Sequence, residues 1–576
     1  MWTQKRIMTM DKLNMTLQTP PPTPPLEGRG ERMGYPLQNA LKALVLLTVL
    51  SICPQGMARN LVDYRVVPLP MSIQTDTTKT FTLQSGMGIA FDDSQPELRR
   101  NAEFLCQWVE QQTGVRLQLT PADKKAAIRL TLGLSAEKEA YAIIINKKGV
   151  TIQAPEAVGI FRAIQTLRKS LPVGQYADGI QLPFATINDA PRFSYRGVHL
   201  DCARHFFGVD VIKRYLDLLA LHGCNQLHWH ITDDQGWRFE VKALPDLAPK
   251  GSVREQTVIG RNSGVFDGQP YGGYYTQDDC REIVRYAAER YINVIPEIDL
   301  PGHMQAALHV YPNLGCTGGP YPVWQIWGVS DDVLCAGNPD VLKFLKTVYG
   351  ELCDVFPSKL IHIGGDECPK QRWKQCPKCQ AKARELGLKD DGKHSIENQL
   401  QTYINREMER FMSERGRSLI GWDETLEGGL TEEATVMSWR GIDGGIEAAR
   451  QHHHVIMTPT DYCYIDYYQQ KNTWNAPLAI GGYVPVSKVY SFEPLVPEKL
   501  TAEQQQYILG AQVNLWTEYI ASPDHLFYML LPRLDAISEV QWCRPEQKDF
   551  ENFKSRLPRM KQLYDLMGVT YCRDVE

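Results

Sequence analysis

The stretch that decides the fold of this chain is Ile361-His362-Ile363-Gly364-Gly365-Asp366-Glu367. A short apolar run ends in two glycines and then in two adjacent carboxylates. The run predicts a buried strand, and the glycines allow backbone or ligand to approach closely. Two acids directly after a buried strand are costly unless they have partners or a chemical task. Asp and Glu are also favoured at helix N-termini, so capping by this pair is the alternative interpretation.

Seven further apolar runs of similar length lie before and after this one, separated by stretches with a helical pattern. Strands separated by helices pair in parallel through right-handed crossovers, and eight such units in about 350 residues predict a (β/α)8 barrel. The predicted strands are 197–201, 225–232, 292–298, 359–365, 418–422, 434–439, 455–458 and 512–516.

Polar and aromatic side chains follow each of these strands. In a barrel of this type all strand C-termini meet at one face, where active sites lie. Each residue alone has an ordinary interpretation as a cap or a core residue, but the repetition at successive strand ends is hard to explain by capping. The strand-end residues are Asp201, Arg204, Asp233, Asp234, Glu297, Asp299, His303, Asp366, Glu367, Trp422, Asp423, Glu424, Trp439, Arg440, Tyr464, Asp466, Trp516 and Glu518.

The segment 59–190 predicts a small α+β domain ahead of the barrel. Alternating strands at 128–132, 142–145 and 150–153 are accompanied by helical patterns at 97–113 and 157–170. A turn-rich stretch at 187–192 marks the boundary, so that 191–576 forms the barrel domain.

The N-terminal residues 1–58 predict a leader and a signal peptide. Residues 1–32 are polar and rich in proline, and they are followed by Met33, Lys42, an apolar stretch at 43–53 and Gly56-Met57-Ala58. A true start at Met33 would explain the long leader, and a type II membrane anchor is the alternative. We therefore expect an exported protein, periplasmic, cell-surface or secreted, with any membrane tether confined to the N-terminus.

Composition excludes some partners. The chain has 576 residues, is 43% apolar and carries a formal net charge of −5, which indicates neither nucleic acid nor an anionic membrane as a partner.

Its 14 cysteines show no compact disulfide framework. Cys376-Pro-Lys-Cys379 is a CxxC pair, but the sequence offers no second CxxC, so a disulfide or a plain loop beside a helix is favoured over a zinc site. The absence of HExxH disfavours a metallohydrolase. No metal and no cofactor are expected.

Carboxylates with aromatic walls are the composition of a glycosidase pocket. One protonated acid donates to the leaving oxygen, and aromatic faces hold the sugar ring. Neighbours in a strand point to opposite faces, so Asp366 and Glu367 do not resemble the facing acid and nucleophile of an ordinary retaining enzyme. Asp366 would instead orient a nucleophile that belongs to the substrate and would raise the pKa of Glu367 by charge repulsion.

The segment His362-Ile-Gly-Gly-Asp-Glu367 resembles the catalytic signature of glycoside hydrolase family 20, the β-N-acetylhexosaminidases. The resemblance extends in the family's order over nearly the whole chain, and the small domain before the barrel also fits. The further motifs are Asp201-Cys-Ala-Arg204-His205-Phe206, His228-Trp-His-Ile-Thr-Asp233-Asp234-Gln-Gly-Trp237, Pro296-Glu297-Ile-Asp299-Leu-Pro-Gly-His303, Gly421-Trp422-Asp-Glu424 and Leu515-Trp516-Thr-Glu518.

The resemblance implies an exo-acting enzyme that releases terminal GlcNAc or GalNAc through an oxazolinium intermediate. Glu367 would be the general acid and base, Asp366 would hold and polarise the 2-acetamido group, and Tyr464 would donate to the same carbonyl oxygen. Three residues would form a relay to Glu367 or support it, with a purely structural role as an equal alternative: Asp233, Asp299 and His303.

The resemblance also implies a set of sugar-binding residues. Aromatic walls would enclose the acetamido group and the sugar face, and charged groups would bind the 3-, 4- and 6-hydroxyls. These residues are Trp422, Trp439 and Trp516, with Arg204, Asp466 and Glu518. Trp474, in a loop after Asp466, would either line an outer subsite or pack on the surface.

Two alternatives stay open beside this interpretation. A lacto-N-biosidase would release a disaccharide, but it needs a pocket open beyond the 4-hydroxyl, which Arg204, Asp466 and Glu518 argue against. A non-catalytic sugar-binding protein would not need the set of Asp366, Glu367 and Tyr464. The expected partner is a carbohydrate, and the chain is expected to be a monomer or a homodimer.

Overall fold

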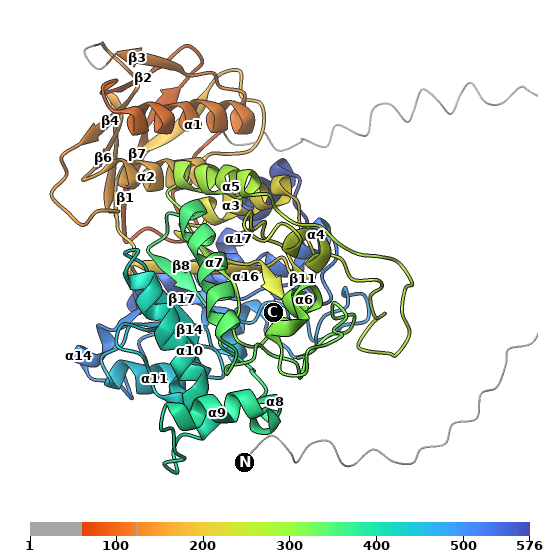
Figure 1. Cartoon of the computed structure of the whole chain (residues 1–576). Coiled ribbons are helices and arrows are strands. Elements are labelled where there is room, and N and C mark those ends of the chain that lie inside the picture. The colour runs from red at the N-terminus through yellow and green to blue at the C-terminus, as the bar shows by residue number, and fades with distance from the viewer. Residues whose placement is uncertain (1–59, 122–123, 576) are drawn as a thin grey trace, which may run out of the picture. The chain divides into compact units, whose positions relative to one another are not determined.

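The computed structural model describes residues 60–121 and 124–575 (Figure 1). The predicted leader and signal peptide lie outside the described residues. Within the described part of the chain, no helix combines the length and the apolar character needed to cross a membrane.

The predicted α+β domain is confirmed. Its sheet has seven strands in the order β1-β7-β5-β6-β4-β2-β3, with antiparallel pairs at one side and parallel pairs at the other. Two helices, α1 (Pro96–Thr113) and α2 (Ala157–Ser170), pack on each other and on the sheet. The strands are β1 (Ser72–Leu83), β2 (Gly88–Phe91), β3 (Gln118–Pro121), β4 (Ile128–Leu132), β5 (Tyr141–Asn146), β6 (Gly149–Ala154) and β7 (Ile180–Asp189).

The predicted barrel is also confirmed. Eight strands close into a parallel barrel in which β17 pairs with β8, and the remaining neighbours follow chain order. The strands are β8 (Tyr195–Asp201), β9 (Gln226–His230), β12 (Asn293–Glu297), β13 (Leu360–His362), β14 (Ser418–Trp422), β15 (Thr435–Ser438), β16 (Val455–Met457) and β17 (Ile508–Val513). A small extra hairpin, β10 (Thr232–Asp233) and β11 (Gly236–Trp237), follows β9.

Helices connect consecutive strands and cover the barrel. The longer ones are α3 (Val209–Leu221), α5 (Gln277–Glu289), α7 (Pro339–Val355), α9 (Pro377–Glu385), α10 (Ile396–Ser413), α11 (Asp443–Arg450), α15 (Pro523–Leu530), α16 (Arg533–Trp542) and α17 (Phe550–Met567). The shorter ones are α4 (Leu247–Gly251), α6 (Gln305–Val310), η1 (Pro312–Leu314), α8 (Gln371–Gln375), η2 (Asp423–Gly428), α12 (Thr460–Cys463), α13 (Val486–Tyr490), α14 (Ala502–Gln505) and η3 (Pro545–Gln547).

The eighth strand lies earlier in the chain than predicted. The prediction placed it at 512–516, whereas β17 spans Ile508–Val513. Gly510 interrupts the apolar run, because a Cβ at this position would lie 1.9 Å from the backbone oxygen of Tyr195. The close approach of β17 to β8 therefore requires a glycine that breaks the sequence pattern of a buried strand, and Trp516 lies beyond the strand end.

A separate apolar cluster fills the inside of the barrel. Ile295, Ile420, Met437 and Ile456 come from four different strands and are fully buried. The same cluster includes three of the predicted site aromatics: Trp422, Tyr464 and Trp516. The packed interior thus continues directly into the aromatic part of the candidate site.

Candidate active site

The two carboxylates after β13 do not point to opposite faces, as the strand-based prediction assumed. The strand ends at His362, and Gly364 and Gly365 have φ angles of 64° and 93°. Glu367 itself has a φ of 46°, which is uncommon for a residue with a side chain. This turn brings both carboxylates to one imidazole nitrogen: His303 Nε2 lies 3.8 Å from Asp366 Oδ2 and 3.9 Å from Glu367 Oε2.

Asp366 and Glu367 nevertheless have different surroundings. The Asp366 side chain is 13% exposed, whereas that of Glu367 is 46% exposed and faces the opening of the site. Burial and then the charge of Asp366 raise the pKa of Glu367 above its usual range. Asp366 also contributes to the raised pKa of Tyr464 and to that of Glu424, so its carboxylate lies toward the aromatic side of the site.

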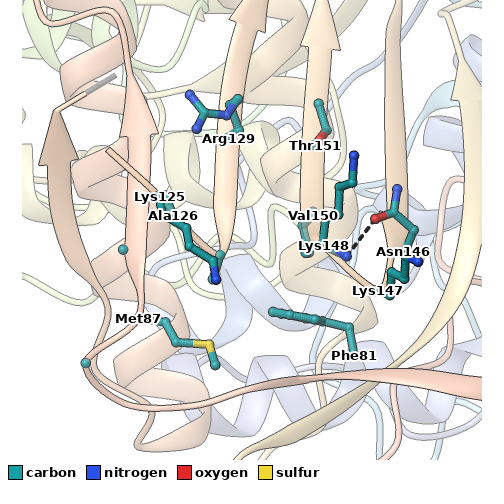
Figure 2. Close-up of a pocket in the computed structure, with 14 residues that line it drawn as sticks. Phe81, Met87, Lys125, Ala126, Arg129, Asn146, Lys147, Lys148, Val150 and Thr151 are labelled. Carbon is teal, nitrogen blue, oxygen red and sulfur yellow. Dashed lines mark hydrogen bonds between the residues drawn. The ribbon is translucent and has the colours of Figure 1, made fainter. Parts of the chain in front are cut away.

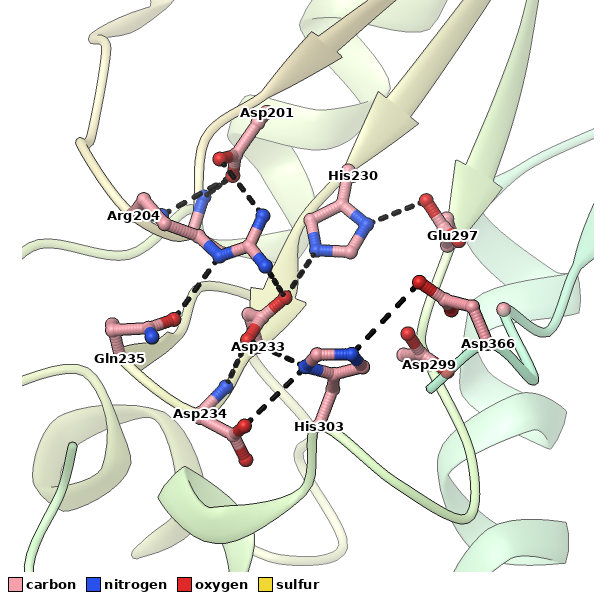
Figure 3. Close-up of polar contacts among 12 residues, drawn as sticks. Asp201, Arg204, His230, Asp233, Asp234, Gln235, Glu297, Asp299, His303 and Asp366 are labelled. Carbon is pink, nitrogen blue, oxygen red and sulfur yellow. Dashed lines mark hydrogen bonds and ion pairs between the residues drawn. The ribbon is translucent and has the colours of Figure 1, made fainter. Parts of the chain in front are cut away.

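Besides the predicted Asp299, which lies within 4.8 Å, two further carboxylates hold His303. Its Nδ1 lies 3.2 Å from Asp233 Oδ1 and 3.3 Å from Asp234 Oδ2, as Figure 3 shows. Burial alone would lower the pKa of His303, but the two carboxylates overcome this and raise it well above the usual range. The contacts to Asp366 and Glu367 therefore run from Asp233 through His303, and Asp299 lies within 4.8 Å of both His303 and Asp366.

Asp299 instead supports the backbone of the catalytic turn. Its Oδ1 accepts a hydrogen bond of 2.9 Å from the N–H of Gly365. A Cβ on Gly364 would lie 2.0 Å from the same oxygen, so the turn and the carboxylate exclude any side chain there. Burial and the neighbouring Asp366 raise the pKa of Asp299 well above its usual range, because two adjacent buried carboxylates do not both ionise readily.

Arg204 lies at the other side of the site and is fixed by three partners. The guanidinium is 2.8 Å from Asp233 Oδ2 and 3.3 Å from Asp201 Oδ2, and its Nε donates to Gln235 Oε1 at 3.0 Å (Figure 3). It also lies over the ring of Trp516, 5.0 Å from the centroid. Asp233 contacts both Arg204 and His303, so this one buried carboxylate connects Arg204 with the imidazole that lies beside Asp366 and Glu367.

The four predicted aromatic residues form one contiguous group. The ring of Trp439 stacks on Tyr464 at 6.0 Å, and the ring of Trp516 lies 6.5 Å from Tyr464 and 5.9 Å from Trp422. Trp439 Nε1 donates to Glu424 Oε2 at 2.9 Å. Trp422 is the deepest member, with 1% of its surface exposed, so it supports the floor of the group more than its wall.

The predicted hydroxyl-binding acids Asp466 and Glu518 lie close to each other. Burial and the charge of Glu518 raise the pKa of Asp466 well above its usual range. Burial also raises the pKa of Glu518, against the effect of Arg204. Three carboxylate oxygens of the predicted site residues are buried without a hydrogen-bond partner among the described residues: Asp299 Oδ2, Asp366 Oδ1 and Asp466 Oδ1. Buried oxygens of this kind call for donors from a ligand or from water.

Trp474, by contrast, is 89% exposed, which excludes the surface-packing alternative for its side chain.

Several His and acid groups near the site have the composition of metal ligands, but the central carboxylate is already surrounded. Glu297 Oε1 accepts a hydrogen bond from Trp422 Nε1 at 2.9 Å and its Oε2 contacts His230 Nδ1 at 2.5 Å. His362 Nδ1 and His228 Nε2 lie 2.9 and 3.0 Å from the same carboxylate. At the other end, the Arg204 cation beside Asp233 disfavours a metal.

The network contains residues to which the sequence assigned no function. His230 links Asp233 to Glu297, since its Nε2 lies 3.0 Å from Asp233 Oδ2. Gln235 and Asp201 hold Arg204, and Glu424 holds Trp439. Asp201 and Glu297 were already among the predicted strand-end residues, and the place of His230 as the last residue of β9 is the same signal, which would have identified it too.

A hollow on the sheet of the small domain is a different kind of site (Figure 2). Its lining includes Phe81, Met87, Lys125, Lys147 and Lys148, and none of the described lining residues is acidic. None of these described residues supplies the carboxylic acid that a glycosidase needs.

A (β/α)8 barrel with buried carboxylates, a fixed arginine and an aromatic wall at its strand ends defines a glycoside hydrolase class of site. The model of the glycosyl hydrolase family 20 catalytic domain matches residues 193–545, and that of domain 2 of the same family matches 63–190. The chain belongs to glycosyl hydrolase family 20.

Known relatives agree with this assignment. A beta-hexosaminidase of Porphyromonas gingivalis is 41% identical over 516 residues, which cover 88% of this chain and 64% of the relative, so the chain spans under two thirds of that protein. A mutant Streptomyces plicatus beta-hexosaminidase in complex with product GlcNAc is 32% identical, with a TM-score of 0.76 and coverage of 88% and 96%. An exo beta-N-acetylglucosaminidase from Vibrio harveyi has a TM-score of 0.77 at 29% identity, with coverage of 89% and 79%.

Proposed function

We propose that this chain is an exo-acting β-N-acetylhexosaminidase that hydrolyses terminal non-reducing GlcNAc or GalNAc by substrate-assisted, retaining catalysis. The observation that carries the proposal is the placement of Asp366 and Glu367 at His303 Nε2, with Glu367 toward the opening and Asp366 toward the aromatic group. We therefore assign Glu367 to the leaving group and Asp366 to the acetamido group.

In the first step, the acetamido carbonyl oxygen attacks C1 while the bond from C1 to the leaving oxygen breaks. Glu367 gives its proton to that oxygen, and its raised pKa keeps the proton available. The positive charge that develops on the acetamido nitrogen is stabilised by the Asp366 carboxylate. Tyr464 donates a hydrogen bond to the attacking oxygen from the aromatic side.

In the second step, Glu367 takes a proton from water, which attacks C1 and opens the oxazolinium ring with retention. His303, whose pKa is raised well above its usual range, places a positive charge beside Asp366, and burial and the charge of Asp366 raise the pKa of Asp299 well above its usual range. Glu424 is not the missing enzyme nucleophile, because burial and the charge of Asp366 raise its pKa to about 9 and keep it protonated.

Exo specificity is supported by the buried end of the site. Arg204, Asp466 and Glu518 supply polar partners for the hydroxyls of a terminal sugar, and Arg204 and Asp466 are 7% and 3% exposed. A fixed guanidinium and buried carboxylates leave unpaired polar atoms unless sugar hydroxyls reach them. A disaccharide-releasing enzyme would need this end to be open.

For the cellular location, export through the N-terminal segment 1–58 remains our proposal, with Met33 as the start of translation and processing near Ala58. N-terminal sequencing of the mature protein tests it, and a mature chain that begins before residue 33 would contradict it.

The activity is tested with an aryl β-N-acetylglucosaminide beside the matching aryl β-glucoside, and with a thiazoline analogue of the oxazoline as inhibitor. Cleavage of the acetamido sugar alone, blocked by the thiazoline, is expected. Equal cleavage of the plain glucoside would mean that an enzyme carboxylate acts as nucleophile.

A further inference from the structure

Four cysteines from two barrel loops meet in one cluster. Cys316 and Cys335 lie in the loop between β12 and β13, and Cys376 and Cys379 lie in the loop between β13 and β14. All four sulfurs are within 4.8 Å of one another. The sequence shows only the CxxC pair, because the other two ligands are single cysteines, separated from each other and from the pair.

The separations of the sulfurs fit a tetrahedral metal site. Cys335 Sγ lies 3.7 Å from Cys376 Sγ and 3.6 Å from Cys379 Sγ, and Cys316 Sγ lies 3.8 Å from Cys379 Sγ. A tetrahedron of sulfurs at about 2.3 Å from a central zinc ion has edges of about 3.8 Å. A disulfide would need about 2.05 Å between two of these sulfurs, and all four cysteines are free.

The surroundings favour the thiolate form that a metal requires. Cys376 is the N-cap of α9 and Cys379 lies in its first turn, so the positive end of a nine-residue helix faces the cluster. The turn after Cys335 also fits the CxxC loop closely, since a Cβ on Gly337 would lie 2.1 Å from the carbonyl of Lys378.

We propose that Cys316, Cys335, Cys376 and Cys379 bind one Zn²⁺ ion as a structural tetrathiolate site. Binding converts four thiols to thiolates and releases four protons, with no change in oxidation state. Four sulfur ligands leave no open coordination position, so the ion has no part in the hydrolysis. The site replaces the disulfide or plain loop that the sequence favoured, and it does not depend on the proposed activity.

The ion would join the two loops that carry the catalytic groups. His303 precedes Cys316 in one loop, and Asp366 and Glu367 precede Cys376 in the other. Both loops also contact each other through the indole of Trp373, whose Nε1 donates to the carbonyl of Leu334 at 2.8 Å. We therefore expect zinc to stabilise the pairing of His303 with the two carboxylates.

The test is the metal content of the full chain, purified without a histidine tag and without chelator. We expect about one zinc ion per chain by elemental analysis, since a closed tetrathiolate binds tightly. In denaturant with chelator and without reductant, all four thiols should react with a thiol reagent. Replacement by Co²⁺ should give the intense visible bands and the sulfur-to-metal charge transfer of a tetrahedral tetrathiolate.

The double variant Cys376→Ser/Cys379→Ser should lose the zinc, and Cys353→Ser is its matched control. Cys353 is a buried thiol in α7 outside the cluster, so this variant should keep one ion per chain. If the double variant does not fold, the zinc content and the cobalt spectrum of the unmodified chain decide the question. A chain without zinc, with iron in its place, or with disulfides among these four cysteines would overturn the proposal.

Discussion

Substituting Asp366 by Asn separates its electrostatic effect on Glu367 from its contact with the substrate. Asn preserves the size of the side chain but removes the negative charge. Because the charge of Asp366 raises the pKa of Glu367, its removal lowers that pKa, and the general acid loses its proton at a lower pH. The alkaline limb of the pH profile of kcat/KM, which reports the acid in the free enzyme, should therefore move to lower pH.

The size of the shift follows from the distances to His303. The carboxylate oxygens lie 3.8 and 3.9 Å from His303 Nε2, hence at most about 8 Å apart, and two unit charges at that distance repel by roughly 2 kcal/mol at an effective dielectric near 20. The Glu367 side chain is 46% exposed, so solvent screening reduces this repulsion to roughly 1 kcal/mol. Loss of the carboxylate at the acetamido group should also lower kcat by about 10²- to 10³-fold.

The assay is kcat/KM for a chitobiose-type substrate across the pH range. Its poor leaving group makes protonation by Glu367 limiting. The matched control is Asp466→Asn, which removes another buried carboxylate that is not among the groups that shift Glu367. This control should lower kcat/KM without moving the alkaline limb. An unmoved limb in Asp366→Asn, or one that moves to higher pH, would refute the role of Asp366 in setting the acid.

Three further outcomes are expected. Glu367→Gln should lower kcat by about 10²- to 10⁴-fold on a poor leaving group and far less on an activated aryl substrate; equal losses on both would contradict the acid role. Gly364→Ala should lose more stability than Gly416→Ala in thermal melts. Both glycines have left-handed φ angles (64° and 67°), so each variant loses about 1–2 kcal/mol of backbone free energy. Only the Cβ at position 364 would also clash with the Asp299 carboxylate. The melting temperature of Asp299→Asn should rise relative to that of the parent chain as pH rises from about 4 to about 7. The pKa of Asp299 is raised in the folded state, so the parent protein loses stability as pH rises above the unfolded-state pKa, and the variant does not. If the melting temperatures of both proteins changed in parallel with pH, Asp299 would not be protonated in the folded parent.

Much of the site was accessible from the sequence because barrel topology turns chain order into spatial order. Once eight strands and their ends were identified, Arg204, Glu367 and Trp516 had to lie at one face. The prediction needed only the approximate end of each strand, and the error at β17 did not move Trp516 away from that face.

The contacts within the site depended on local backbone geometry that the sequence pattern does not contain. The strand prediction placed Asp366 and Glu367 on opposite faces, but Gly364, Gly365 and the positive φ of Glu367 turn both toward His303. Asp299 lies within 4.8 Å of His303, as expected, but it also accepts the N–H of Gly365, and Asp233 is a further carboxylate that contacts the imidazole.

By itself, the sequence determined the barrel, the domain before it, the family and the identity of the acids, since these depend on patterns that repeat along the chain. Only the tertiary structure decided which side chains form hydrogen bonds and ion pairs with one another. It alone also brought Cys316 and Cys335 to the CxxC pair. The physical reason is range: hydrophobic periodicity acts over neighbouring residues, whereas ion pairs and metal ligation act over a few ångströms in space between residues far apart in sequence.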